Sequence, residues 1–181
     1  MSSVVIAGDT SGSITLSAPA TAGTNTITLP TLTGTMLTNK TAGTVLQVVS
    51  ATYSTITSTS TTTYADSGLT VSITPSSATS KVLVLLSING VSKGVDCCLN
   101  ARLNRDSTSI SNITGLAAYT GSAVTASGSA AFNYLDSPAS TSSIAYKVQI
   151  ASSNAGRSVS INDYAAVLGS VSAITVMEIA A

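Results

Sequence analysis

Lys81-Val-Leu-Val-Leu-Leu-Ser-Ile-Asn-Gly90 is the longest nearly unbroken apolar segment of this chain. It is short for a stable helix, rich in β-forming residues, and ends on Asn89-Gly90, a dipeptide typical of turns. Side chains alternate between the two faces of a strand, so both faces are aliphatic: Val82, Val84 and Leu86 on one, Leu83 and Leu85 on the other. Burying each is worth about 1.5–3 kcal/mol. We expect the facing sheet to cover one face and a neighbouring subunit the other.

The composition is that of a folded protein with few charges. Of 181 residues, 44% are hydrophobic and 8% charged, the net charge is zero and the mean hydropathy is +0.44. Typical soluble domains contain about 25% charged residues. Low-complexity disorder is the alternative, but disordered chains combine low hydrophobicity with high net charge. The sequence therefore predicts a β protein whose uncharged surface suits an assembly.

Targeting signals and disulfides are not expected. Residues 1–8 lack a basic segment followed by a long apolar one, so we expect no signal peptide. No segment approaches about 18 consecutive apolar residues, so we expect no membrane span. Cys97 and Cys98 are neighbours, and a strand would point their side chains to opposite faces. We expect free thiols, one of them buried, in a protein that folds in a reducing compartment.

Residues 1–40 differ from the rest, with Asp9 as the only charge before Lys40. Short β-like pieces alternate with turn residues, and 13–16 (Ser-Ile-Thr-Leu) is nearly copied at 26–29 (Thr-Ile-Thr-Leu). Such units are too small to fold alone but can add strands to a neighbour's sheet. We predict an anchoring arm, with a disordered tail as the alternative. The predicted anchoring residues are Val4, Ile6, Ile14, Leu16, Ile27 and Leu29.

Residues 41–181 show the period-two alternation of a compact all-β domain. Turn signals recur at the spacing expected of a sandwich. The predicted strands cover 45–53, 69–74, 81–88, 99–104, 129–135, 144–151, 159–161 and 173–180. Turns or loops are expected at residues 54–63, 105–107 and 152–157. Residues 107–128 are assigned only loosely, as short strands and loops.

The sequence offers few side chains suited to catalysis. The chain has no histidine, which excludes Ser-His-Asp and Cys-His systems and most zinc sites. Asp136 and Asp163 are the one pair considered for glycoside hydrolysis, but both sit beside turn residues, where Asp usually caps the backbone. Asp96, Cys97 and Cys98 are adjacent in a strand and cannot converge on one ion. We predict no enzyme activity, no metal and no cofactor.

Binding motifs are equally sparse. No glycine-rich loop precedes a helix, and the seven Lys and Arg residues are dispersed, so neither phosphate nor nucleic acid is an expected ligand. Tyrosines could line a sugar-binding face but are more typical of cores and interfaces. The six are Tyr53, Tyr64, Tyr119, Tyr134, Tyr146 and Tyr164.

Two arm segments, Ala7-Gly-Asp-Thr-Ser-Gly-Ser-Ile-Thr-Leu16 and Ala22-Gly-Thr-Asn-Thr-Ile-Thr-Leu-Pro30, resemble the N-terminal repeats of bacteriophage tail-fibre and capsid-surface proteins, those of cyanophages especially. The rest resembles their β-sandwich heads. The matching pieces there are Leu46-Gln-Val-Val49, 68–75, 80–84, Asp136-Ser-Pro138, 146–149 and 174–180. The resemblance implies a jelly-roll-like antiparallel β-sandwich head that assembles as a homotrimer on a virion, and it transfers no catalytic residues.

The chain passes from arm to head without a stalk, which favours a capsid decoration (cement) protein that binds the major capsid protein through its arm. It would be made in the bacterial host cytoplasm and reside on the capsid surface, with neither nucleic acid nor membrane as partner. One alternative is a short tail-fibre head whose loops 54–63, 105–128 or 152–157 contact host glycans. Another is a hydrolase of host polysaccharide. The residues expected at the trimer axis are Val82, Val84, Leu86, Tyr146, Val148 and Ile150.

Overall fold

Contacts in the computed structural model divide the chain into two compact units, Met1–Met36 and Leu37–Ala181. The structure describes residues 3–7, 10–17, 20–21, 41–116, 126–163 and 170–181. Strands, turns and bends make up this described part, which confirms the all-β prediction. The predicted boundary between residues 40 and 41 stays a prediction, since residues 22–40 lie outside the described part.

The first unit contains an antiparallel hairpin of β1 (Ser3–Ala7) and β2 (Ser13–Ser17). Val4 lies opposite Leu16, and Ile6 lies opposite Ile14. Gly12, just before β2, has a φ of +81°, a conformation that glycine adopts without a side-chain penalty. The hairpin therefore follows from β-branched residues on both sides of a glycine-containing turn.

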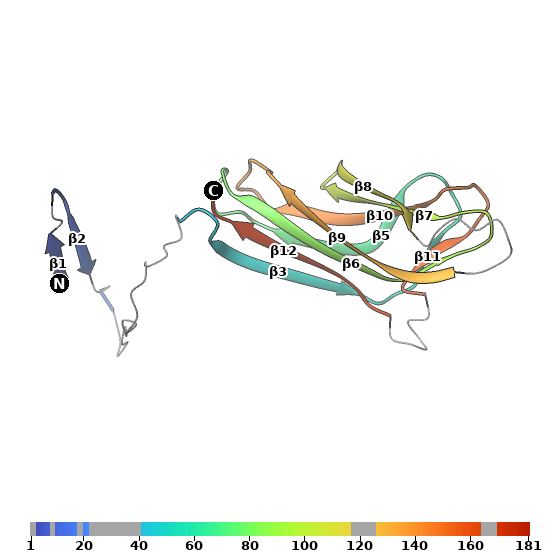
Figure 1. Cartoon of the computed structure of the whole chain (residues 1–181), viewed down its shortest axis with the longest axis horizontal. Coiled ribbons are helices and arrows are strands. Elements are labelled where there is room, and N and C mark those ends of the chain that lie inside the picture. Colours follow the sequence, from blue (N-terminus) through green and yellow to red (C-terminus); the bar gives the residue numbers. More distant parts are fainter. Residues whose placement is uncertain (1–2, 8–9, 18–19, 22–40, 117–125, 164–169) are drawn as a thin grey trace. The chain divides into compact units, whose positions relative to one another are not determined.

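The second unit, the head, consists of two antiparallel sheets (Figure 1). Its strands are β3 (Val45–Tyr53), β4 (Thr57–Thr59), β5 (Ala65–Ile73), β6 (Lys81–Lys93), β7 (Leu99–Arg105), β8 (Thr108–Leu116), β9 (Ala126–Asp136), β10 (Ile144–Ser152), β11 (Val159–Ile161) and β12 (Ser172–Ile179). One sheet has the order β5-β10-β7-β8. The other has the order β3-β12-β6-β11-β4. In this sheet β12 pairs with one edge of β6, and β9 pairs with the other edge.

The long strands of the head follow the jelly-roll order. Without the two short strands β4 and β11, the sheets read β3-β12-β6-β9 and β5-β10-β7-β8. Counted along the chain, the eight long strands appear in the first sheet in the order first, eighth, third and sixth. In the facing sheet the order is second, seventh, fourth and fifth. That is an eight-stranded double-sheet jelly roll. The predicted jelly-roll-like sandwich is confirmed.

The core lies between the two sheets and follows the alternation in the sequence. Leu69, Val71 and Ile73 of β5 are buried while their polar neighbours are exposed. The inward faces of β6, β7, β10 and β12 are buried in the same alternating way. Both thiols are free, with Cys97 buried and Cys98 partly exposed, as predicted.

Two expected loops are different in the structure. Asn89-Gly90 does not end the central strand, because β6 continues to Lys93 across a bulge between Ile88 and Val91. Gly90 takes a φ of +56° there, and the backbone carbonyl oxygens of Asn89 and Gly90 accept hydrogen bonds from Asn162 and Asp163, both at 2.9 Å. Segment 54–63 contains β4, which pairs with β11. Gly90 therefore lies in a β-bulge rather than in a turn that ends the strand.

Candidate functional site

The hairpin carries an exposed apolar face. Four of the six predicted anchoring residues form two cross-strand pairs on this face, and their exposed fractions are 61% for Val4, 51% for Leu16, 53% for Ile6 and 66% for Ile14. The alternate residues, including Thr15 opposite Val5, lie on the other face. The remaining two, Ile27 and Leu29, lie outside the described residues.

This face has no cover within the described part of its unit. Two-stranded hairpins are marginally stable in water, and contiguous exposed apolar side chains mark interaction surfaces. Each aliphatic side chain buried by a partner contributes about 1.5–3 kcal/mol. The arrangement suits docking by burial and requires no chemistry. We call Val4, Ile6, Ile14 and Leu16 the hairpin face.

The six residues expected at the trimer axis lie inside the head. Five have no exposed area and Leu86 is 3% exposed, the five being Val82, Val84, Tyr146, Val148 and Ile150. Their side chains belong to the core between the sheets and cannot meet a neighbouring subunit. This placement of the interface is wrong, because alternation shows that a face is apolar but not which apolar face the second sheet covers. The trimer itself stays a prediction.

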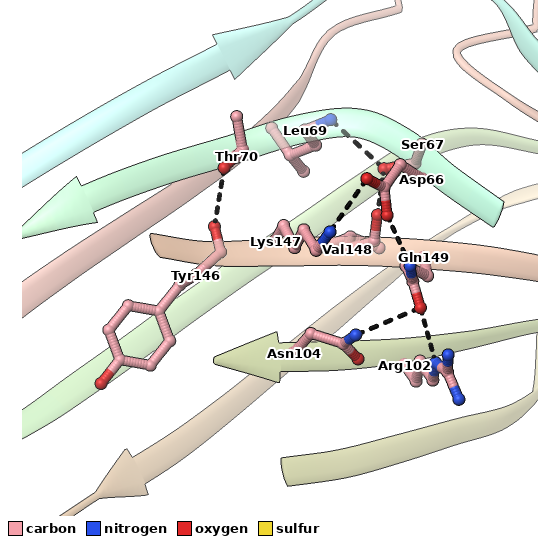
Figure 2. A network of polar contacts seen from close by, with 10 residues as sticks. All are labelled: Asp66, Ser67, Leu69, Thr70, Arg102, Asn104, Tyr146, Lys147, Val148 and Gln149. Atoms are coloured by element: carbon pink, nitrogen blue, oxygen red, sulfur yellow. Dashed lines mark hydrogen bonds and ion pairs between the residues drawn. The ribbon is translucent and has the colours of Figure 1, made fainter. Parts of the chain in front are cut away.

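A polar network covers the outer face of the four-stranded sheet (Figure 2). Lys147 Nζ donates to Asp66 Oδ2 at 2.9 Å, and Gln149 Nε2 donates to Asp66 Oδ1. Gln149 Oε1 in turn accepts from Arg102 Nε at 2.8 Å. The hydrogen bond from Gln149, followed by that from Lys147, lowers the pKa of the Asp66 carboxyl. Side chains from β5, β10 and β7 are therefore held in fixed orientations.

Two further features border this network. The guanidinium of Arg102 lies over the ring of Tyr64, 4.4 Å from its centroid. Asn104 is 2% exposed and donates from Nδ2 to Gln149 Oε1 at 3.1 Å, while its buried Oδ1 has no partner within the described residues. An aromatic ring beside oriented amides and charges can bind a hydroxylated ligand.

The tyrosines do not gather on one face. Tyr146 is in the core, Tyr53 packs against it from β3, and Tyr134 stacks with Phe132 at a centroid distance of 6.5 Å. Tyr64 belongs to the polar face just described. Tyr119 and Tyr164 lie outside the described residues. A shared sugar-binding row of tyrosines is therefore not formed by the described ones.

Asp136 takes part in a buried network between the sheets. Arg105 Nη1 donates to its Oδ1 at 2.9 Å and Oδ2 at 3.0 Å, and Tyr146 Oη donates to Oδ2 at 2.7 Å. Asp163 accepts a hydrogen bond from Ser160 Oγ at 3.4 Å. Asp136 is only 5% exposed. Its two oxygens are occupied by structural partners, and sequence reasoning did not anticipate this network because Arg105 and Asp136 lie in different sheets.

Glu178 forms a second buried polar site. Its Oε2 accepts from Gln47 Nε2 at 2.6 Å, and its Oε1 accepts from both the backbone N and the Oγ of Ser76 at 2.7 Å. Burial alone would raise the pKa of this carboxyl, but the hydrogen bonds from Gln47, Ser76 and Ser80 outweigh it and bring the pKa to about 2. The carboxylate ties β12 to β3 and to the segment after β5.

No group of three or more acidic or cysteine side chains in the described ranges could hold a metal ion. Within them, no helix has the length and hydropathy to cross a membrane.

No protein-family model and no curated protein matches the chain. Among solved structures, it is similar to chains of infectious bursal disease virus. The VP2 subviral particle matches at 16% identity and a TM-score of 0.33, over 74% of this chain and 37% of that one. The Gx strain structure matches at 17% identity and a TM-score of 0.35, over 92% of this chain and 46% of that one. The chain thus spans less than half the length of these two, and the jelly-roll assignment rests on strand order.

Proposed function

We propose that this chain is a structural protein of a virion, a capsid decoration protein that docks its N-terminal hairpin on the major capsid protein. The hairpin face carries the proposal, because it presents four exposed aliphatic side chains in two cross-strand pairs. The resemblance of arm and head to phage surface proteins supports it, and a jelly-roll head is compatible with it.

The physical basis is burial. A hairpin that lays its apolar face on a capsid subunit gains from each covered side chain, and its edges can extend a neighbouring sheet. Distributed over many copies, such contacts hold neighbouring capsid subunits together without catalysis. The nearly uncharged composition fits a protein that lives within an assembly.

The test measures occupancy of capsids that lack the protein. Purified full-length chain, a deletion of residues 2–40, and Ile6→Asn with Ile14→Asn are added, and bound copies per capsid are counted. We expect the deletion to abolish binding and the double substitution to weaken it about a hundredfold or more, since two buried isoleucines are lost. Thr15→Asn, on the opposite face of the hairpin, is the matched control. Full occupancy by the deleted chain would defeat the proposal.

Localisation on intact virions by electron cryomicroscopy separates the capsid from the tail. Density spread evenly over the head agrees with decoration, whereas density confined to the tail tip contradicts it.

A tail-fibre head is the second candidate, favoured by the polar network on the four-stranded sheet. Tyr64 and Arg102 are suited to a sugar ring and a glycan hydroxyl. Specific binding of the purified chain to host cells, lost in Arg102→Ala, would favour this candidate over capsid decoration.

A further inference from the structure

The outer face of β3-β12-β6-β9 carries three rows of side chains that run across the strands. The strand registers align them, and they differ in size. The first row, which we call the ridge, is Val48, Met177, Leu83 and Leu135. The middle row is Ser50, Thr175, Leu85 and Asn133. The third row, which we call the hollow, is Thr52, Ala173, Ser87 and Ala131.

The ridge projects into solvent beside a depression. Val48 is 55% and Leu135 51% exposed, and Leu85 of the middle row is 38% exposed. A depression of about 320 Å³ lies over the middle and third rows, with Ala131 and Ala173 among its lining residues. Large side chains and a matching space for them therefore occur on one face.

The chemistry of this face selects a second copy of this chain as its occupant. The three rows contain no charged residue. Ser, Thr and Asn side chains both donate and accept hydrogen bonds, so each can bond to its own copy. A row of Lys or Asp would instead repel itself. A charged partner would find no complementary charge in these rows.

We propose that two copies of this chain pair through this face, about a twofold axis that runs across the strands along the middle row. Rotation about that axis places the ridge of each copy over the hollow of the other. It also places every middle-row residue over its own copy. The strands of the two sheets then run antiparallel, in the aligned packing of sheets about 10 Å apart. Such an interface is isologous and closes without forming a filament.

The size of the face is sufficient. Four strands about 4.8 Å apart and the eight residues of β12 at about 3.4 Å each give the whole outer face roughly 19 by 27 Å, or about 500 Å² in plane, of which the three rows take about the central two-thirds. Side-chain relief increases the accessible area toward the roughly 800 Å² per partner of a standard interface. The pairing is separate from capsid docking, because it involves the head alone and is measured without capsids.

The experiment determines the mass of the full-length chain in solution by light scattering and sedimentation. We expect two chain masses, in place of the three that the resemblance to phage surface proteins implies. Ala131→Trp fills the hollow and Leu135→Lys places a charge on the ridge, and both positions are exposed, so the fold tolerates them. Each is expected to weaken pairing at least about tenfold and shift the mass toward one chain. Ser72→Trp, exposed on the outer face of the other sheet, is the control and leaves the mass unchanged.

A crosslink tests the axis. Ser50 lies at the rim of the middle row on the edge strand β3. In a Cys98→Ser background, Ser50→Cys is expected to link to its own copy through a short bismaleimide, whereas Ser72→Cys is not. Three results would each overturn the proposal. The first is a wild-type mass of one or three chains, and the second is a mass of two chains that Ala131→Trp leaves unchanged. The third is a paired Ser50→Cys protein that does not crosslink.

Discussion

Tyr146 and Asp136 join the two sheets of the head through one buried hydrogen bond. Tyr146 lies on β10 in the four-stranded sheet, and its Oη donates at 2.7 Å to Asp136 Oδ2 at the end of β9 in the other sheet. Burial, followed by the hydrogen bond to Asp136, raises the pKa of the Tyr146 phenol, which keeps its proton available for donation. Arg105 on β7 donates to the same carboxylate. The network thus fixes one sheet against the other.

Tyr146→Phe is expected to lower the free energy of unfolding by about 1.5–3 kcal/mol, the usual contribution of a hydrogen bond to a charged group. The ring still fills the core, so only the bond is lost. Urea unfolding at neutral pH measures the change. Tyr134→Phe is the control, since its hydroxyl has no hydrogen-bond partner among the described residues, and an equal loss in both variants would contradict the assigned role.

Glu178→Gln is expected to destabilise the head by about 2 kcal/mol at pH 7, because the amide keeps the size of the carboxylate but loses its charge-assisted bonds. The folded pKa of about 2 lies below the unfolded value of 4.5. The stability from this carboxylate is therefore complete above about pH 4.5 and is lost as the pH falls toward 2. Urea unfolding of both proteins at several pH values should show their difference shrinking over that window. A constant difference would show that ionisation is not responsible.

Val148→Asp is expected to prevent folding rather than to change the number of subunits. Val148 has no exposed area and belongs to the cluster of buried apolar side chains between the sheets. An unpaired buried charge costs several kcal/mol, comparable to the whole stability of a domain. Circular dichroism and solubility after expression check this. A folded Val148→Asp protein of altered mass would restore Val148 to a subunit interface.

Alternation in the sequence was sufficient to predict an all-β sandwich, whereas the jelly-roll form of the head was implied by the resemblance to phage surface proteins. Every second residue is apolar and buried from Leu69 to Ile73 in β5 and from Ile144 to Ile150 in β10. The pairing of Val4, Ile6, Ile14 and Leu16 on one hairpin face also follows from period-two spacing on either side of a glycine turn. Both features depend on residues close in sequence, which is why they were predictable.

Features that depend on distant pairing were not predictable. Both faces of β6 read as apolar, and only the position of the second sheet shows that Val84 is core while Leu85 faces outward. Likewise Asp136 reads as a turn cap until Tyr146 and Arg105 are brought to it from the other sheet. Local pattern fixes which residues share a face, whereas the long-range strand order decides what that face meets.

Gly90 provides the sharpest test of the bulge in the central strand. A Cβ at this position would lie 2.5 Å from the backbone oxygen and 2.8 Å from the backbone nitrogen of Asp163, and the φ of +56° disfavours any side chain. The contacted atoms are backbone, whose N–H bonds back to the Gly90 carbonyl oxygen, so they cannot move aside cheaply. Gly90→Ala is expected to cost about 2–4 kcal/mol, the sum of left-handed strain and overpacking.

Gly156→Ala is the matched control for Gly90→Ala. Its φ is +79°, but no atom lies within 4 Å of the added Cβ. It should therefore cost only the conformational strain, about 1–2 kcal/mol. Urea unfolding of the two variants separates steric overlap from backbone strain. If they lose the same stability, the close approach of Asp163 to the bulge contributes nothing, and Asn89-Gly90 is held by its conformation alone.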